Sequence, residues 1–396
     1  MHPCFKRTHE FGPTLPSNIQ CKYVNEEGIE KLLDEEADPE NLIAGDFRAT
    51  EQPGLTSLHS LFLNEHNRIA KNISQLYSLL SDDDIYQMAR QIVIAELQNI
   101  VYNEFLPVVL GSTTMEQYNI KLPIHSTSSR QSILTTQTPA STISTSTPTP
   151  TSMATSYLGH VNPTAFNEFA TFAFRFGHSM VPKVLKPNRN PENCPIKDNF
   201  FDFEEFVLGT DFSGKAWEDL LHGISNTESP PFDAVFNKHL TNFLFCGDNC
   251  KTGVGFGQDL AARNIQRGRD HGLPGYVYYR EYCGLTKPTD WNDKPEDISP
   301  ENWKNLESVY NNVEDIDAFS GAFSENSLFD GLVGPTIACI LGQQFKNLMD
   351  GDRFFFTHSR VENSFGQGLA DNVKAMVRLR KLSDIMCDNL DMESVR

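Results

Sequence analysis

The sequence has little positive charge and no long apolar run, and each absence excludes a class of protein. Its 396 residues contain 33 lysines and arginines against 52 aspartates and glutamates, which gives a net charge of −19. A chain this acidic is repelled by nucleic acid and by anionic membrane surfaces, so neither is expected as its main partner. No stretch of about 20 apolar residues is present, and we therefore expect no membrane-spanning helix.

The sequence also lacks a recognisable secretion signal and any metal-type spacing of cysteines. Residues 1–6, MHPCFK, have no apolar core, so either the protein is cytosolic or sequence upstream of Met1 is missing. The eight cysteines form no Cys-x-x-Cys pair and no zinc-type cluster with histidine, although Cys246 and Cys250 lie four residues apart. Scattered cysteines in a long chain are typical of disulfides in a secreted protein. Asn72-Ile73-Ser74 is a glycosylation sequon of a kind that also arises by chance.

No long alternation of apolar and polar residues is present, so the predicted fold class is mainly α, with little or no sheet. Helical spacing of apolar residues predicts helices over residues 55–80 and 82–105, packed as an antiparallel pair, with Ser81 capping the second and Pro107 ending it. The almost uncharged residues 162–181 predict a buried helix. A short helix is expected near residues 27–34 and loops over residues 182–229. Further helices are expected near residues 231–245, 257–265, 300–312, 329–348 and 365–386.

Residues 126–157 consist mostly of serine, threonine and proline and cannot form a packed core. We interpret them as a disordered, mucin-like insertion within a single domain that covers residues 1–396. The alternative is a boundary between two independent domains. The helices expected on either side need each other to bury their apolar faces, which favours the single domain.

Two segments carry more polar groups than an apolar pattern requires. In the first, residues 172–178 (FAFRFGH), a histidine ends an aromatic, almost uncharged helix, and Arg175 lies three residues earlier on the same helix face. His178 alone would be interpreted as a structural residue. Arg175 changes that interpretation, because a guanidinium on such a helix needs an anion. A haem supplies both partners, since its iron binds the imidazole and its propionates bind the guanidinium.

The second segment, residues 264–276, reads NIQRGRDHGLPGY. Neutral imidazole binds iron through one nitrogen, and its other N–H needs an acceptor that fixes the ring orientation. The side-chain carbonyl of Asn264 would serve. Arg267, one helical turn further on, would pair with a second propionate. His271 is expected to hydrogen-bond within its own turn, and no role is assigned to His59 or His66.

In these two segments the chain resembles the animal haem peroxidases, the group that includes peroxidasin, peroxinectin and myeloperoxidase. Three more stretches resemble the same family in the same order: residues 44–73, 102–111 and 350–356. The resemblance runs through most of residues 12–390. It implies a helical domain around a buried haem b that reduces hydrogen peroxide and oxidises a small donor. It also implies a secreted protein with a disulfide between Cys283 and Cys339. The pairing of the other cysteines is left open: Cys4, Cys21, Cys194, Cys246, Cys250 and Cys387.

The resemblance also implies roles for single residues. On the proximal side, His178 is the iron ligand, Asn264 is its hydrogen-bond partner, and Arg175 and Arg267 bind propionates. On the distal side, a catalytic arginine polarises the O–O bond of peroxide and a glutamate three residues later can form an ester with haem. The matching distal residues here are Arg48 and Glu51, and Gln52 replaces the methionine that forms a sulfonium link in myeloperoxidase.

The family's distal histidine, its neighbouring aspartate and its calcium loop have no match in the 47 residues before Arg48. Activation of peroxide needs a base, and a permanently charged arginine cannot act as one. We therefore expect this chain alone to bind haem but to turn over slowly. An N-terminal part supplied in cis or as a second chain is expected to raise the rate by about 10²- to 10⁴-fold.

Besides the peroxidase, two other interpretations remain open at this point. One is a non-catalytic secreted module that binds haem or acts in matrix adhesion. The other is an all-α protein whose core polar groups are simply satisfied by one another. The presence of Arg48, Glu51, His178, Asn264 and Arg267 favours the enzyme, because an idle pocket has no physical need for that set. The donor is not specified, since halide, thiocyanate, phenol and tyrosine oxidation share the scaffold.

Overall fold

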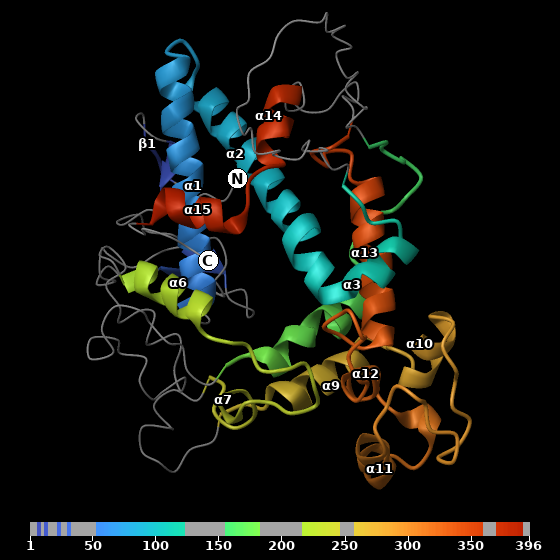
Figure 1. Ribbon diagram of the computed structural model, residues 1–396. Coiled ribbons are helices and arrows are strands. Elements are labelled where there is room, and N and C mark those ends of the chain that lie inside the picture. The colour runs from blue at the N-terminus through green and yellow to red at the C-terminus, as the bar shows by residue number, and fades with distance from the viewer. Residues whose placement is uncertain are drawn as a thin grey trace, which may run out of the picture.

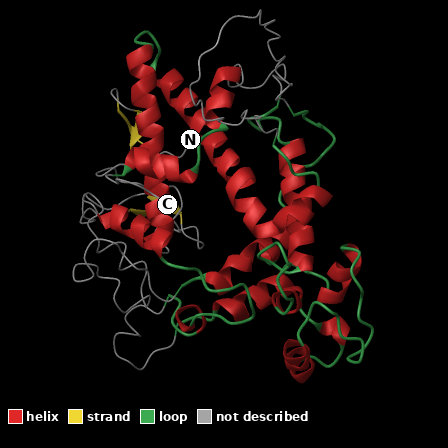
Figure 2. Ribbon diagram, in the orientation of Figure 1, coloured by secondary structure: helices red, strands yellow, loops and turns green. Residues whose placement is uncertain are grey.

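The computed structural model is mainly helical in the residues that it describes, as expected (Figure 2). Its only strands there are two short antiparallel hairpins. In the first, β1 (Lys6–Thr8) pairs with β2 (Gly12–Thr14). In the second, β3 (Lys22–Val24) pairs with β4 (Glu30–Leu32). The described residues are 6–8, 12–14, 22–24 and 30–32, with backbone only, and 53–122, 155–182, 216–245, 257–358 and 370–390.

The short helix expected near residues 27–34 is wrong, because this segment contains strand β4. In the hairpin, Lys22 lies opposite Leu32 and Val24 opposite Glu30. A helix through Gly28 would lose about 1 kcal/mol relative to one with alanine there. Tyr23 and Val24, by contrast, belong to residue types that favour strands.

The first two long helices form the antiparallel pair that the sequence predicts (Figure 1). Helix α1 spans Pro53–Leu76 and α2 spans Asp82–Ile100. Ser81 caps α2, since its hydroxyl oxygen accepts a hydrogen bond from the backbone N–H of Asp84 at 3.2 Å. The two helices bury Ile69, Ala70 and Ile73 against Ala89.

Pro107 does not end the second helix, which corrects the sequence prediction. A π-helical turn, η2 (Val101–Phe105), continues α2 directly into α3 (Leu106–Gln117). Pro107 is the second residue of α3, where a proline is tolerated because the first turn of a helix leaves its N–H groups without intrahelical acceptors. The break comes instead at Gly111, whose φ of 74° favours glycine and where a Cβ would lie 2.5 Å from the carbonyl oxygen of Asp330.

The stretch Asp82–Gln117 is long and apolar enough to cross a membrane by length and composition alone. Its most apolar 18-residue window is 39% buried in the structure. The stretch contains the π turn and the break at Gly111, and it buries Glu96 in an ion pair with Arg380 at 3.1 Å.

The other helices differ from the prediction mainly at their ends. The helix expected over residues 162–181 is divided at Phe172 into α4 (Asn167–Thr171) and a 3₁₀ helix, η3 (Ala173–Met180). Four helices were not expected from the sequence: α6 (Ala216–Asn226), α10 (Tyr276–Tyr282), the 3₁₀ helix η5 (Val313–Asp315) and α12 (Ala318–Phe323). The remainder are α7 (Lys238–Thr241), α9 (Leu260–Asp270), α11 (Pro300–Val309), α13 (Pro335–Gly351), α14 (Asp371–Val377) and α15 (Leu382–Asn389).

Most of the predicted insertion at residues 126–157 lies outside the described residues, but its last three residues belong to the fold. The backbone N–H of Thr155 donates to the carbonyl of Thr357 at 3.0 Å, and the Thr155 hydroxyl lies 2.7 Å from Nδ1 of His358. The chain that follows the insertion is thus attached just beyond the end of α13.

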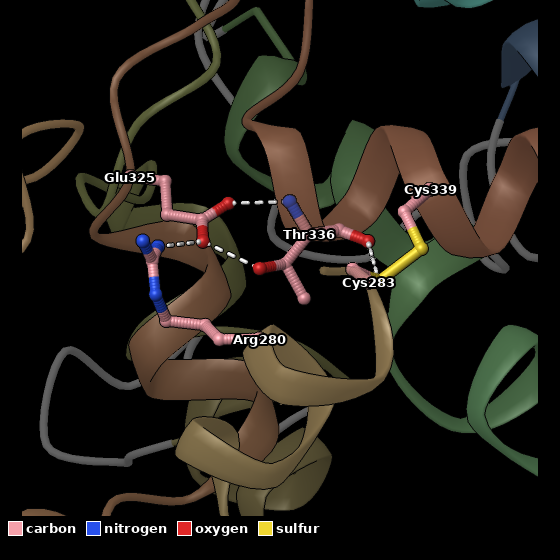
Figure 3. The surroundings of a disulfide bond; sticks show 5 residues. All are labelled: Arg280, Cys283, Glu325, Thr336 and Cys339. Carbon is pink, nitrogen blue, oxygen red and sulfur yellow. Dashed lines mark hydrogen bonds and ion pairs between the residues drawn. A yellow bond between two sulfur atoms is a disulfide. The ribbon is translucent and has the colours of Figure 1, made fainter. Parts of the chain in front are cut away.

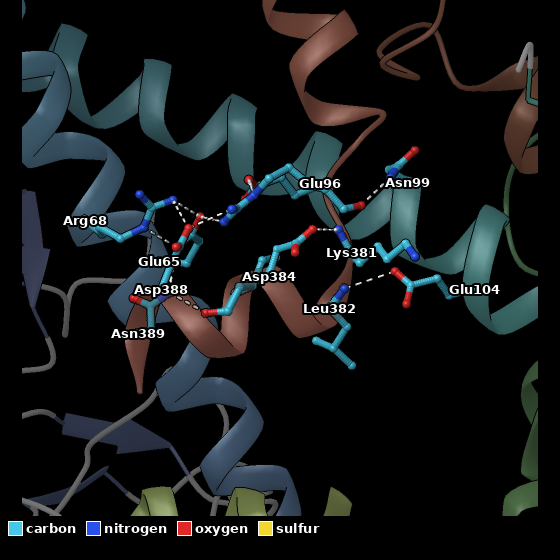
Figure 4. A network of polar contacts seen from close by, with 12 residues as sticks. Glu65, Arg68, Glu96, Asn99, Glu104, Lys381, Leu382, Asp384, Asp388 and Asn389 are labelled. Atoms are coloured by element: carbon cyan, nitrogen blue, oxygen red, sulfur yellow. Dashed lines mark hydrogen bonds and ion pairs between the residues drawn. The ribbon is translucent and has the colours of Figure 1, made fainter. Parts of the chain in front are cut away.

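A charged network joins the C-terminal helix to the α1–α2 pair (Figure 4). The guanidinium of Arg380, just before α15, contacts Glu65 of α1 at 2.9 Å, Glu96 of α2 at 3.1 Å and Asp388 of α15 at 2.6 Å. Burial, and then the nearby Glu65 carboxylate, raise the pKa of Glu96 to about 7. Arg380 therefore joins the consecutive helices α1 and α2 to α15, which lies far away in the sequence.

A disulfide between Cys283 and Cys339 joins the end of α10 to α13, as the resemblance implies (Figure 3). Beside it lies the fully buried carboxylate of Glu325, which accepts hydrogen bonds from Arg280 at 3.0 Å and from the backbone N–H of Thr336 at 2.9 Å. Burial raises the pKa of Glu325 to about 7. The bond and the network together attach α10 to the core. Cys387 is a free, exposed thiol.

Candidate functional site

The helix η3 carries the two proximal residues that the sequence singles out, and one side of it is fixed in the core. The backbone of Phe172 (φ −140°, ψ −46°) ends α4, and the N–H of Arg175 then donates to the Phe172 carbonyl at 3.0 Å. Phe172 and Phe176 are buried. Arg175 and His178 lie on the less buried side of the same helix.

Helix α9 presents the third residue of the site. Asp259 caps it, since its carboxylate accepts from the N–H of Ala262 at 3.1 Å. Asn264 is fully buried, although α9 is otherwise polar, so its amide needs partners inside the protein. Helices α4, α7 and α12 pack against α9, and α12 and α13 pack against η3, which holds the two site helices together (Figure 1).

The structure brings His178, Asn264 and Arg175 together, as the sequence predicts. The Asn264 Nδ2 amino group donates to Nδ1 of His178 at 2.9 Å. The Asn264 Oδ1 carbonyl accepts from Nη1 of Arg175 at 2.5 Å. Arg175 also donates through Nε to the Ala170 carbonyl at 3.1 Å. The contact with His178 thus involves the amide nitrogen, whereas the prediction used the carbonyl oxygen.

The electrostatics of the site keep the imidazole of His178 neutral. Burial, and then the charge of Arg175, lower the pKa of His178 to about 4. A neutral imidazole is the form that binds a metal. Asn264 contacts Nδ1, and no hydrogen bond joins the other ring nitrogen, Nε2, to the described residues.

The site also holds more positive charge than the described residues neutralise. Arg175 has an amide and a backbone carbonyl as partners, and burial followed by the charge of Arg267 lowers its pKa. Arg267 lies 3.7 Å from Asp270 in an exposed pair, which is a weak interaction. A half-buried arginine beside a second arginine is suited to bind an anion. One available imidazole nitrogen next to two guanidiniums fits a haem with its propionates.

Two contacts that sequence reasoning missed attach α4 and η3 to their neighbours. Nδ1 of His271 lies 2.8 Å from Oδ1 of Asn167, whose amino group donates to the His271 carbonyl at 3.0 Å. We had expected the His271 side chain to bond within its own turn. It bonds to Asn167 instead. The buried side chain of Gln344 in α13 accepts from the N–H of Phe166 at 2.7 Å. No local pattern indicates either pair, because its members lie more than a hundred residues apart.

The distal candidates Arg48 and Glu51 lie outside the described residues, and so does Gln52. The roles given to them therefore stay predictions. In the part of the chain that the structure describes, no three histidine, cysteine, aspartate or glutamate side chains form a metal-binding cluster. A haem needs only one protein ligand on the proximal side, and His178 is available for it.

Comparison with known proteins agrees with this geometry. The family model for animal haem peroxidase matches residues 9–396. The peroxidasin homologue pxn-2 of Caenorhabditis elegans is 36% identical over 359 residues, which cover 88% of this chain and 23% of that protein. Human thyroid peroxidase is 32% identical over 358 residues, which cover 89% of this chain and 34% of that protein. The chain thus spans well under half of these relatives.

Solved structures show the same fold. Peroxidase A from Dictyostelium discoideum superposes with a TM-score of 0.65 and 27% identity, over 95% of this chain and 65% of that chain. A fatty acid α-dioxygenase from Arabidopsis thaliana superposes with a TM-score of 0.59 over 98% of this chain and 58% of that one. Its identity of 18% supports a shared fold only.

Proposed function

The chain belongs to the animal haem peroxidase family, and from that membership we propose that it binds haem through His178 and reduces hydrogen peroxide while oxidising a small donor. The observation that carries the proposal is the half-buried contact of 2.9 Å between His178 and Asn264. Arg175 and Arg267 beside it would bind the propionates. The ester link through Glu51 and the polarising role of Arg48 are part of the same proposal.

The side-chain amide of Asn264 can donate a hydrogen bond through its nitrogen or accept one through its oxygen, and haem binding requires the second. In the structure its nitrogen donates to Nδ1 of His178, so the ring proton is on Nε2. Iron needs Nε2 free, with the proton on Nδ1 and an oxygen to accept it. We propose that the amide turns over, while Arg175 exchanges the Asn264 oxygen for a propionate. Binding of the propionate would thus break the hydrogen bond from Arg175 to the Asn264 oxygen, which otherwise holds the amide in its present orientation.

A bound haem would supply the redox chemistry, since its iron can exchange electrons with peroxide and with the donor. The chain's residues do the rest. Asn264 would set the orientation and basicity of His178, the iron ligand, and Arg175 and Arg267 would bind the propionates. Arg48 would favour negative charge on the departing oxygen of peroxide but cannot remove its proton.

We propose that the protein works in an oxidising, extracellular compartment. The disulfide between Cys283 and Cys339 supports this, because such bonds persist in secreted proteins and are rare in the cytosol.

Replacement of Asn264 by alanine should leave haem bound but weaken the complex by about 10- to 100-fold, because the ligand loses the partner that orients it. Asn264→Asp should largely preserve affinity, since a carboxylate accepts from Nδ1–H. Haem titration followed by the Soret band measures both. Asn99→Ala is the matched control, because this buried asparagine bonds to the Arg380 carbonyl away from the site. Equal affinity in all four proteins would contradict the role of Asn264.

Peroxidase activity tests the function itself. The haem-loaded chain should oxidise a phenolic donor only when hydrogen peroxide is present, and faster than free haem at the same concentration. Initial rates with and without peroxide provide the measurement. A rate no higher than that of free haem would contradict the proposal.

A further inference from the structure

The chain contains one site for N-linked glycosylation, and the structure places it on an exposed helix face. Asn72-Ile73-Ser74 is the only Asn-x-Ser or Asn-x-Thr triplet without proline in the middle position, since Asn162-Pro163-Thr164 is blocked by its proline. Asn72 is exposed in α1, whereas the next residue, Ile73, is buried against α2. The acceptor amide therefore faces away from the helix pair.

The surface next to Asn72 is unusually apolar. Leu76, four residues further on and so on the same face of α1, has 76% of its surface exposed. In the turn that leads to α2, Tyr77 is 56% exposed and Leu79 fully exposed. We call Leu76, Tyr77 and Leu79 the apolar turn. Such a group of exposed side chains needs a cover in a protein that stays dissolved.

We propose that Asn72 carries an N-linked glycan and that this glycan covers the apolar turn. The amide nitrogen of Asn72 displaces a lipid pyrophosphate from the anomeric carbon of a lipid-linked oligosaccharide, and the amide proton leaves with the transfer. The nascent chain accepts the sugar in extended form, so the later helix is no obstacle. A bulky, hydrated sugar then lies beside Leu76. The inference rests on the proposed secretion and is independent of haem.

The proposed glycan would lie far from the haem site. Helix α1 begins at Pro53, and Asn72 lies nineteen residues further along it, near the other end of the helix. At about 1.5 Å per residue, this is roughly 28 Å from Pro53. The α1–α2 turn lies at the opposite end of the molecule from α9 (Figure 1). Changes at Asn72 should therefore leave haem binding intact, so the two proposals fail separately.

The experiment uses the full chain, secreted from cultured human cells behind a cleavable signal. Peptide N-glycosidase in ¹⁸O-water converts a glycosylated Asn72 to labelled aspartate, which peptide mass spectrometry detects. We expect the label in wild type and in Ser74→Thr, which keeps the sequon, and none in Ser74→Ala or Asn72→Gln. The two unglycosylated variants should bind several-fold more of a hydrophobic dye, and Leu79→Ser added to Asn72→Gln should reduce that excess.

Each outcome decides one part of the proposal. An unmodified Asn72 in secreted wild-type protein would overturn the site. A glycan whose loss leaves dye binding unchanged would overturn the cover over the apolar turn. Failure of wild type to bind haem would contradict the proposed function and leave the glycan result standing.

Discussion

Replacement of His178 by alanine is expected to weaken specific haem binding by more than about 100-fold. Loss of a partner behind a metal ligand already costs about 10- to 100-fold, and loss of the ligand itself costs more. The structure supports the size of this effect, because it provides a neutral imidazole whose Nδ1 is fixed by Asn264. Haem titration followed by the Soret band gives the affinity.

The matched control is His271→Ala, which removes a histidine from the neighbouring segment, residues 264–276, without touching Nε2 of His178. His271 contacts Asn167, so its loss should loosen the attachment of α4 and change affinity only slightly. Thermal unfolding of both variants separates loss of the ligand from loss of the fold. Equal, specific binding by wild type and His178→Ala would show that another group ligates the iron.

The second large effect is expected from the disulfide. Replacing Cys283 and Cys339 together by serine should lower the free energy of unfolding by about 4 kcal/mol, because the bond closes a loop with a sequence separation of 56 residues. The loss of stability should be largest at α10, because the disulfide attaches this helix to α13. The network at Glu325 remains in place and keeps α10 docked at low denaturant.

Urea unfolding monitored by tryptophan fluorescence measures this difference, because Trp303 is buried near the core. Cys387→Ser is the control, since that thiol is free and exposed and its loss should be nearly neutral. An unchanged midpoint in the double variant would contradict the contribution of the bond.

The sequence predicted the proximal site better than it predicted the secondary structure around it. His178 and Asn264 lie side by side as expected, because a buried polar side chain needs a hydrogen-bond partner. The contact between Arg175 and Asn264 was not expected, since Arg175 was assigned to a propionate. The orientation of the Asn264 amide was not predictable, since it depends on which neighbour donates. The pair Asn167 and His271 was missed because no spacing relates them.

The errors in the helices have local causes. A proline usually ends a helix. The π turn before Pro107 places it in the first turn of α3, where its missing N–H costs no hydrogen bond. The segment of residues 162–181 is rich in aromatic residues and almost uncharged, so no change in its pattern marks the break at Phe172. Helix α10, with its four tyrosines, carries little helical periodicity and is held by the tertiary contacts of Tyr276 and Arg280 with Glu325.

The central claim is that His178 is the axial ligand of a bound haem. The iron–histidine stretching vibration of the ferrous protein, recorded by resonance Raman spectroscopy, tests it directly. The account predicts a band that shifts when histidine is labelled with ¹⁵N, changes in frequency in Asn264→Ala and disappears in His178→Ala. A band that persists unchanged in His178→Ala, or no isotope-sensitive band in wild type, would contradict it.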